Sequence, residues 1–315
     1  MNTRFVRRTS KRMAAIVTSL TIALCLFGLV LIALPSGHEQ KDPAPIAYDE
    51  DEDPMSEAVA ALLDTASSLH GSIDTLTYEQ RYEGQTYSKQ AFIYVPASYS
   101  PGTPANVLYL THGWWGNAAG LADGVAPVVD ELETTGEAAP TIVVFATYYP
   151  DRSFATDDYE DDYTLNRFFA TSEIDTLMNA VETRYTTFAH GDTSDASLRA
   201  SRRHRAFGGF SMGATTTWDA FALRPQYFYG YMPMAGESWI GREEDADEER
   251  LAELITAGAV REGYGPGDFR ILASVGSEDP ALWDMTPQLD ELHQDYPNLM
   301  TETSLQLWID DGESH

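Results

Sequence analysis

The chain has 315 residues, of which 49 are acidic and 20 are basic, so its formal net charge at pH 7 is −29. A surface of this charge repels nucleic acid and anionic lipid headgroups, and it disfavours strongly anionic substrates. The single cysteine, Cys25, lies in an apolar N-terminal run, which excludes a disulfide, a thiolate nucleophile or a cysteine metal site from the rest of the chain.

The N-terminal segment carries a topology signal. Residues 1–12 form a basic tail, and residues 13–34 form an uncharged apolar run that would span roughly 30 Å of hydrocarbon as a helix. A cleaved signal peptide has a shorter apolar stretch followed by a small-residue cleavage site, which is not clear here. The sequence therefore predicts a membrane anchor over 13–34 with the following residues outside the cell membrane. Secretion after cleavage is the alternative.

The next segment, residues 35–75, is predicted to be an acidic linker or stalk. Its first half is polar and contains prolines, and it shows no apolar periodicity that a core could bury. Residues 56–69 have apolar side chains at helical spacing and could form one helix. The remaining residues, 76–315, are predicted to be a single catalytic domain.

In residues 76–315, short strand patterns alternate with longer helical patterns. This alternation is typical of a mostly parallel sheet with helices on both faces. We expect strands over residues 90–95, 106–110, 141–147, 205–210, 228–232, 269–275 and 304–309. We expect helices over residues 168–185, 212–223 and 285–293. Catalytic side chains in such sheets lie just beyond the carboxyl ends of strands, so a site is expected at these ends.

One motif lies at such a strand end. Residues 209–213 read Gly-Phe-Ser-Met-Gly, which matches G-x-S-x-G, and the motif follows a predicted strand and precedes a predicted helix. This context is that of a nucleophile elbow, in which a sharp turn presents the serine and leaves room only for small flanking residues. The sequence therefore predicts an α/β-hydrolase fold, preceded by the N-terminal transmembrane helix, with Ser211 as the nucleophile.

A serine hydroxyl needs a base to accept its proton, and in this fold the partners follow in the order serine, acid, histidine. Only His293 and His315 follow Ser211. His293 lies inside a helical pattern, whereas His315 follows a strand and a loop, so His315 is the predicted base. The acid should come just after the strand over 269–275, where the candidates in order of preference are Asp279, Glu278 and Asp284.

The negative charge that develops on the substrate oxygen needs two N–H donors. The amide of Met212, directly after the nucleophile, is the first predicted donor, and the loop after the strand over 106–110 should supply the second. Trp114 is the predicted donor in that loop, with Trp115 as the alternative. His112 is predicted to hold the loop in place. No histidine and carboxylate spacing indicates a metal site, and the reaction requires no cofactor.

Several blocks around these residues resemble feruloyl esterases of carbohydrate esterase family 1, in the esterase D-like part of the α/β-hydrolase superfamily. The blocks are residues 204–213, 215–218, 232–239, 276–279 and 285–288. The resemblance implies hydrolysis of esters that join hydroxycinnamic acids to plant cell-wall polysaccharides such as xylan, with Ser211, Asp279 and His315 as the triad. It also implies that Trp239 helps to bind the aromatic acyl group.

The chain departs from the family pattern in two places. The bulky pair Trp114 and Trp115 replaces small residues after His-Gly, which makes Trp115 a further candidate for substrate binding. Family members continue past the catalytic histidine into a closing helix, whereas this chain stops at His315, so the domain is expected to be truncated there or to carry its base on a terminal segment. Alternatives to the feruloyl esterase are an acetyl or other acyl esterase, an envelope acyltransferase, and a catalytically dead carbohydrate-binding protein.

Overall fold

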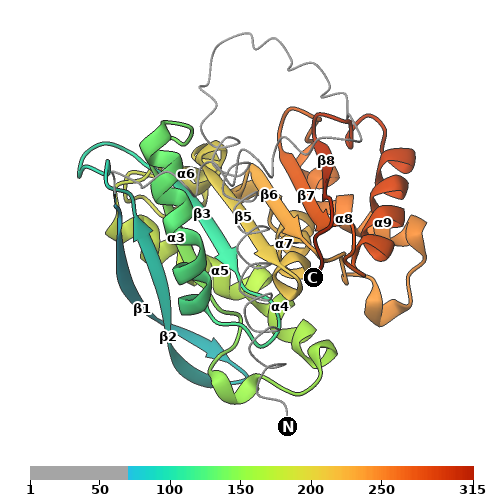
Figure 1. The fold of residues 1–315 in the computed structure, drawn as a ribbon, viewed down its shortest axis with the longest axis horizontal. Helices are drawn as coiled ribbons and strands as arrows, with labels where there is room; N and C mark the ends of the chain where they lie inside the picture. Colours follow the sequence, from blue (N-terminus) through green and yellow to red (C-terminus); the bar gives the residue numbers. More distant parts are fainter. Residues whose placement is uncertain (1–69) are drawn as a thin grey trace.

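The computed structural model describes residues 70–315, which build a twisted eight-stranded sheet with helices on both faces (Figure 1). The strands are β1 (Ser72–Tyr82), β2 (Gln85–Val95), β3 (Asn106–Thr111), β4 (Thr141–Ala146), β5 (Arg205–Phe210), β6 (Gly230–Met234), β7 (Arg270–Gly276) and β8 (Leu305–Asp310). Their order across the sheet is β1-β2-β4-β3-β5-β6-β7-β8. The first two pairings are antiparallel and all the others are parallel. The predicted α/β architecture with a mostly parallel sheet is therefore confirmed.

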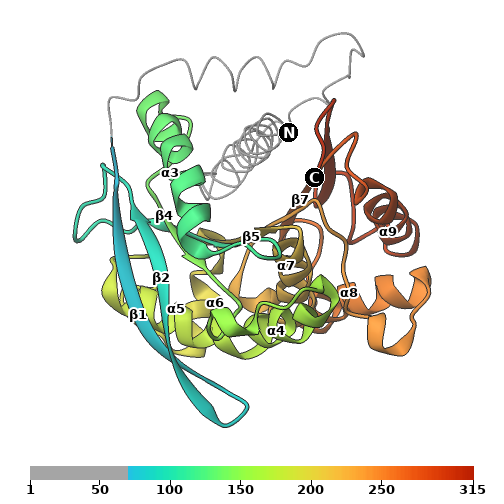
Figure 2. The ribbon, with the colours of Figure 1, turned by 60° about the horizontal axis from the view of Figure 1, so that its bottom comes forward.

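The helices cover the two faces unequally. They are α3 (Ala118–Thr135), α4 (Tyr163–Phe168), α5 (Ile174–Arg184), α6 (Asp195–Ala200), α7 (Met212–Leu223), α8 (Glu248–Glu262) and α9 (Leu282–Asp295). Helix α3 packs on one face, whereas α4, α5, α7 and α8 lie along the other (Figure 2). Alternate residues of β3 point to the two sides, so Val107 and Tyr109 join the larger core and Leu108 and Leu110 join the core under α3.

Strand β1 was not predicted. It begins at Ser72, within the range that the sequence analysis assigned to the linker, and pairs along its length with β2 through a turn at Glu83 and Gly84. Both turn residues have positive φ, at 47° and 81°, as a tight hairpin turn requires. The strand is amphipathic, because only Leu76, Tyr78 and Gln80 are buried. An edge strand with so few apolar residues in alternation is difficult to recognise from the sequence.

The helix predicted over residues 168–185 is interrupted. Helix α4 ends at Phe168, one π-helical turn covers Phe169–Glu173, and α5 begins at Ile174. The wider turn directs Glu173 into the interior, where its side chain is 1% exposed. Its carboxylate forms an ion pair with Lys89 and accepts a hydrogen bond from the hydroxyl of Tyr78. The position of Glu173 thus depends on an irregular turn that apolar spacing does not reveal.

The fold prediction needs one correction. It placed a transmembrane helix over residues 13–34 ahead of the hydrolase domain. Along residues 70–315, no helix has both the length and the apolar character that crossing a bilayer requires. Residues 13–34, and the helix predicted over 56–69, lie outside the described residues. The membrane-spanning helix is therefore not part of the fold that the structure supports.

Candidate active site

Ser211 lies at the turn between β5 and α7, in the middle of the parallel sheet. Its backbone has φ 56° and ψ −117°, a conformation that a residue with a side chain rarely adopts. Such a residue persists only where the surrounding structure holds it, and it costs on the order of 1–3 kcal/mol. The sharp turn is the geometry of a nucleophile elbow, as the motif predicts.

The two glycines of the motif explain why the turn can form. A Cβ atom at Gly209 would lie 2.3 Å from the carbonyl oxygen of Gly213, and one at Gly213 would lie 2.4 Å from that of Thr111. Both distances are far below any tolerated contact with rigid backbone. The G-x-S-x-G pattern is thus the result of close packing between the elbow and the end of β3.

The structure brings His315 and Asp279 to Ser211. The Nε2 atom of His315 lies 2.9 Å from Oγ of Ser211, and its Nδ1 atom lies 3.0 and 3.1 Å from the two carboxylate oxygens of Asp279. Asp279 is 1% exposed, and one of its oxygens also accepts the amide N–H of Ala281 at 2.8 Å. The three side chains therefore form a continuous hydrogen-bonded chain from a buried carboxylate to an accessible hydroxyl.

The loops that carry the acid and the base pack against each other. A Cβ atom at Gly276 would lie 2.2 Å from the carbonyl oxygen of Glu313, so a glycine at the end of β7 lets the two loops approach. Across this contact, the amide of Glu278 donates to the carbonyl of Glu313 at 2.8 Å. Glu278 thus bonds the loops through its backbone, whereas the next side chain, Asp279, reaches His315.

The other candidates for acid and base lie elsewhere. Asp284 lines the cavity in front of Ser211 but has no hydrogen bond to His315 within the described residues. His293 lies on α9, where its Nδ1 atom is 2.7 Å from the carbonyl oxygen of Met300. His293 therefore joins α9 to the following loop, and it does not take part in the chain of bonds at Ser211.

The two predicted oxyanion donors lie on either side of Ser211. Met212 is the first residue of α7, where backbone N–H groups lack a carbonyl partner in the helix. The loop after β3 approaches from the other side, since a Cβ atom at Gly113 would lie 3.1 Å from that of Ser211. The amide of Trp115 donates to the hydroxyl of Tyr149 at 3.3 Å. The alternative donor therefore has a partner, and Trp114 remains the candidate.

His112 anchors the loop that follows β3 through buried hydrogen bonds. It is 3% exposed, and its ring nitrogens lie 2.7 Å from the carbonyl oxygen of Gly113 and 2.7 Å from the hydroxyl of Thr147. Burial disfavours the charged ring and lowers the pKa of His112 to about 4. A neutral histidine with both nitrogens bonded has the structural role that the sequence analysis predicted for it.

Comparisons with known proteins identify the family. The Esterase family model matches residues 87–301, which is most of the chain and most of the sheet described above. The chain belongs to this family. Endo-1,4-beta-xylanase Y of Acetivibrio thermocellus is 28% identical over 244 residues, which cover 75% of this chain. The esterase spans only 21% of the length of that relative.

Solved structures agree with this placement. A feruloyl esterase module from Clostridium thermocellum, complexed with sinapinate, is 25% identical to the esterase and has a TM-score of 0.63; the match covers 77% of this chain and 82% of the module. A CE1 ferulic acid esterase from the anaerobic fungus Anaeromyces mucronatus has the same fold, with a TM-score of 0.61 at 17% identity over 80% of this chain and 87% of its own. The resemblance stated from the sequence is thereby confirmed at the level of family and fold.

A cavity of about 420 Å³ opens in front of Ser211 in the esterase. All five predicted catalytic and oxyanion residues line it, together with Trp239, the predicted acyl-binding residue. The five are Ser211, Asp279, His315, Met212 and Trp114. Trp115, the other predicted substrate-binding residue, is 46% exposed and is not among the lining residues. Of the two neighbouring tryptophans, only Trp114 therefore lines the cavity.

Tyr159 also lines this cavity, and the sequence analysis did not single it out. Its ring lies 5.8 Å from that of Trp239 and 6.0 Å from that of Trp114, so it connects the two tryptophans. The residue lies in the acidic run 157–162, whose composition predicts a solvated loop. The run instead places Tyr159 at the cavity and buries Asp162, which accepts a hydrogen bond from Tyr149. Within residues 70–315, no group of three or more histidine, cysteine or acidic residues is arranged to hold a metal ion.

A buried acid lies under the elbow. Asp219, on α7, is fully buried and accepts a hydrogen bond from Tyr163 at 3.3 Å. Burial raises the pKa of Asp219 to about 7. The ring of Tyr163 in turn contacts that of Trp239 at 5.9 Å. Tyr163 thus links the ring of Trp239, which lines the cavity, to a buried carboxyl group whose pKa is close to neutral pH.

Proposed function

We propose that the esterase is a serine hydrolase that releases hydroxycinnamic acids, of the ferulic type, from esters on plant cell-wall polysaccharide. The observation that carries the proposal is the chain of hydrogen bonds from Asp279 through His315 to Ser211 at a strained elbow. A relative of known structure is a feruloyl esterase module with sinapinate, and the curated relative is a xylanase. The first relative supports an aromatic acyl group in the substrate, and the second supports a polysaccharide as its alcohol.

The geometry supports a two-step mechanism. Ser211 attacks the ester carbonyl while His315 accepts the hydroxyl proton, and Asp279 keeps the imidazole in the tautomer whose Nε2 faces Ser211. The amides of Met212 and Trp114 stabilise the oxyanion. His315 then returns the proton to the leaving alcohol, and a water molecule hydrolyses the acyl-enzyme by the reverse sequence.

The cavity suits an aromatic acid. Trp114, Tyr159 and Trp239 surround the space next to Ser211, with ring centroids about 6 Å apart. Aromatic side chains at such separations provide flat apolar surface and edges for a further ring. An ester of a polysaccharide lies outside cells, so the proposed place of action is extracellular. The net charge of −29 argues against nucleic acid as a partner.

The test compares ferulate release from methyl ferulate with acetate release from a simple aryl acetate, using the full chain and its Ser211→Ala variant. We expect both activities in the parent and a loss of at least about 10⁴-fold in kcat for both in the variant, because the nucleophile is removed. Turnover of the aryl acetate alone would keep the hydrolase and reject the aromatic substrate. Activity that survives in Ser211→Ala would reject the serine mechanism.

A further inference from the structure

The loop that carries Trp114 contains a backbone conformation that needs external support. Trp115 has φ 60°, in the left-handed region, although its side chain is an indole. The following amide, of Gly116, bonds back to the carbonyl of Gly113 at 3.0 Å and closes a tight turn. A turn with such a residue relaxes unless neighbouring groups fix its peptides. The Trp114 amide lies inside this turn, so its direction depends on what fixes it.

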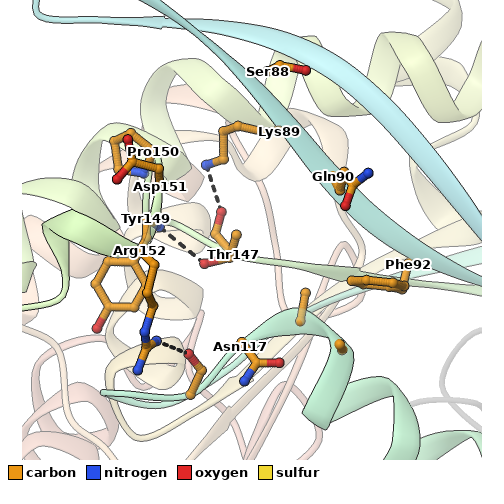
Figure 3. Close-up of a pocket in the computed structure, with 13 residues that line it drawn as sticks. Ser88, Lys89, Gln90, Phe92, Asn117, Thr147, Tyr149, Pro150, Asp151 and Arg152 are labelled. Carbon is orange, nitrogen blue, oxygen red and sulfur yellow. Dashed lines mark hydrogen bonds between the residues drawn. The ribbon is translucent and has the colours of Figure 1, made fainter.

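Two side chains from the segment after β4 hold the peptides on both sides of Trp115. The guanidinium of Arg152 donates to the carbonyl oxygen of Gly116 at 2.8 Å, a bond drawn as a dashed line in Figure 3. It also donates to the carbonyl oxygen of Trp115 at 2.9 Å. The hydroxyl of Tyr149 accepts the amide N–H of Trp115 at 3.3 Å and donates to the buried carboxylate of Asp162. The N–H and the C=O of Trp115 are therefore both bonded by side chains.

The aromatic rings add to this contact. The guanidinium carbon of Arg152 lies 4.9 Å from the ring of Trp115 and 5.8 Å from that of Tyr149. A planar guanidinium can stack on a ring and donate from its edge at the same time, which a lysine ammonium cannot do. Within residues 70–315, no carboxylate lies within 4.0 Å of Arg152, even though the chain carries an excess of acids. The guanidinium of Arg152 thus bonds the loop, while its charge acts on the Asp162 carboxylate only at longer range.

We propose that Arg152 is a positioning residue for the reaction: its bidentate contact with the Trp115 and Gly116 carbonyls, together with Tyr149 on the Trp115 amide, fixes the turn that aims the Trp114 amide at the oxyanion. This inference rests on the proposed serine hydrolysis. It adds a residue that touches neither the substrate nor Ser211. Because Arg152 acts on the transition state only, its loss should lower kcat and leave KM nearly unchanged.

The experiment measures hydrolysis of a simple aryl acetate by the full chain and by Arg152→Gln, Arg152→Lys and Tyr149→Phe. The parent activity is established first, so an inactive parent counts against the proposed function, whereas the variants report only on the loop. We expect Arg152→Gln to lower kcat about 10- to 100-fold, since loss of one oxyanion donor costs about 10²- to 10³-fold and a misdirected donor retains part of its effect. Arg152→Lys should recover little of this, because it lacks the planar fork.

Two further readouts separate positioning from general stability. Arg152 is solvent-exposed, so guanidinium ion added at millimolar concentration should partly restore kcat in Arg152→Gln. An aryl boronic acid, which forms a tetrahedral adduct with the serine hydroxyl and places an oxygen in the oxyanion position, should bind more weakly to the variant by a similar factor. Binding of ferulate, the product acid, should be unchanged.

Arg203→Gln is the matched control. Arg203 also donates to a backbone carbonyl, that of Gly267 at 3.1 Å, and also lies over a ring, that of Tyr229 at 4.8 Å, but it is remote from the loop. Its kcat should stay within about twofold of the parent. A kcat for Arg152→Gln within about twofold of the parent, or a change confined to KM, overturns the proposal. A fall in kcat with a lowered melting temperature and no rescue by guanidinium also overturns it, since that result assigns Arg152 a structural role only.

Discussion

The proposed nucleophile and the proposed base of this esterase are held in different ways. Ser211 is fixed by main-chain packing, because backbone of Gly213 and Thr111 fills the space beside the elbow. His315 has a side chain that is 43% exposed, and it is held by the Asp279 carboxylate and by contact with the ring of Phe210 at 4.9 Å. Steric packing therefore fixes Ser211, whereas hydrogen bonds and a ring contact hold His315, which passes a proton in two directions in the proposed mechanism.

This difference predicts that substitutions in the two regions impair different properties of the protein. A change at the elbow should act on the stability of the fold. A change at the acid and base should act on the rate and leave the fold intact. The two regions are 2.9 Å apart at their closest side-chain atoms, so distance does not explain the contrast.

The largest effect is expected at Asp279. Asp279→Asn keeps the shape of the side chain but favours the wrong tautomer of His315, and the corresponding change in a serine protease lowers kcat by about 10⁴-fold. We expect a loss of this order for the esterase, with a melting temperature within a few degrees of the parent. The measurement is kcat for an aryl acetate together with thermal unfolding. A large loss of stability would show that Asp279 is mainly a structural residue.

The next effect is expected at Gly209, and it should appear in stability. Gly209→Ala places a methyl group 2.3 Å from the carbonyl oxygen of Gly213, which is rigid backbone, so the elbow must move. We expect a loss of about 3 kcal/mol or more in the free energy of unfolding, at the upper end of the overpacking range. Urea unfolding measures it. Gly124→Ala is the control, because no atom lies within 4 Å of the added methyl group on α3.

A smaller, pH-dependent effect is expected at His112, on the side of the nucleophile. Because the folded pKa of about 4 is below the ordinary value of 6.5, the unfolded chain binds a proton between these values and the folded chain does not. The free energy of unfolding should therefore decrease as the pH falls from about 6.5 to about 4, by roughly 3 kcal/mol in total, and be unaffected by His112 above that window.

The test for His112 is the difference in unfolding free energy between the parent and His112→Gln at several pH values. This difference should shrink as the pH falls through the window. Asp219 contributes in the opposite direction, since its raised pKa makes the folded chain retain a proton up to about pH 7, but it is common to both proteins and cancels. Parallel curves for the two proteins would mean that His112 does not remain neutral in the fold.

The sequence predicted the parallel strands of the sheet better than its antiparallel edge. Strand β5, helix α7 and most of β3 appear within a residue of their expected bounds, because they are strongly apolar and are punctuated by glycines or by the motif. Strand β1 was missed because only one face of a polar segment is buried. Helix α3 was missed because Gly120, Gly124 and Pro127 lower the helical propensity of a segment that packing against the sheet nevertheless stabilises.

The site shows the same limit. The chain order of serine, acid and histidine, together with the rule of strand ends, was enough to select Ser211, Asp279 and His315, and their catalytic roles remain proposals. Nothing in the sequence relates Arg152 or Tyr159 to these residues, because both lie in irregular segments without periodicity or motif. Their contacts with Trp115 and Trp239 arise only when the loops after β3, β4 and β6 meet at one edge of the sheet.

The π-helical turn over Phe169–Glu173 has a consequence for how the family can change in length. A π turn holds one residue more than the α-helical turn that it replaces. Deleting a single residue there would restore a continuous α-helix, but it would rotate α4 relative to α5 by about 100°. Glu173 would then leave Lys89, and Tyr163 and Asn166 on α4 would leave the elbow helix. We therefore expect homologous chains to keep the number of residues in this segment and not to differ there by insertion or deletion.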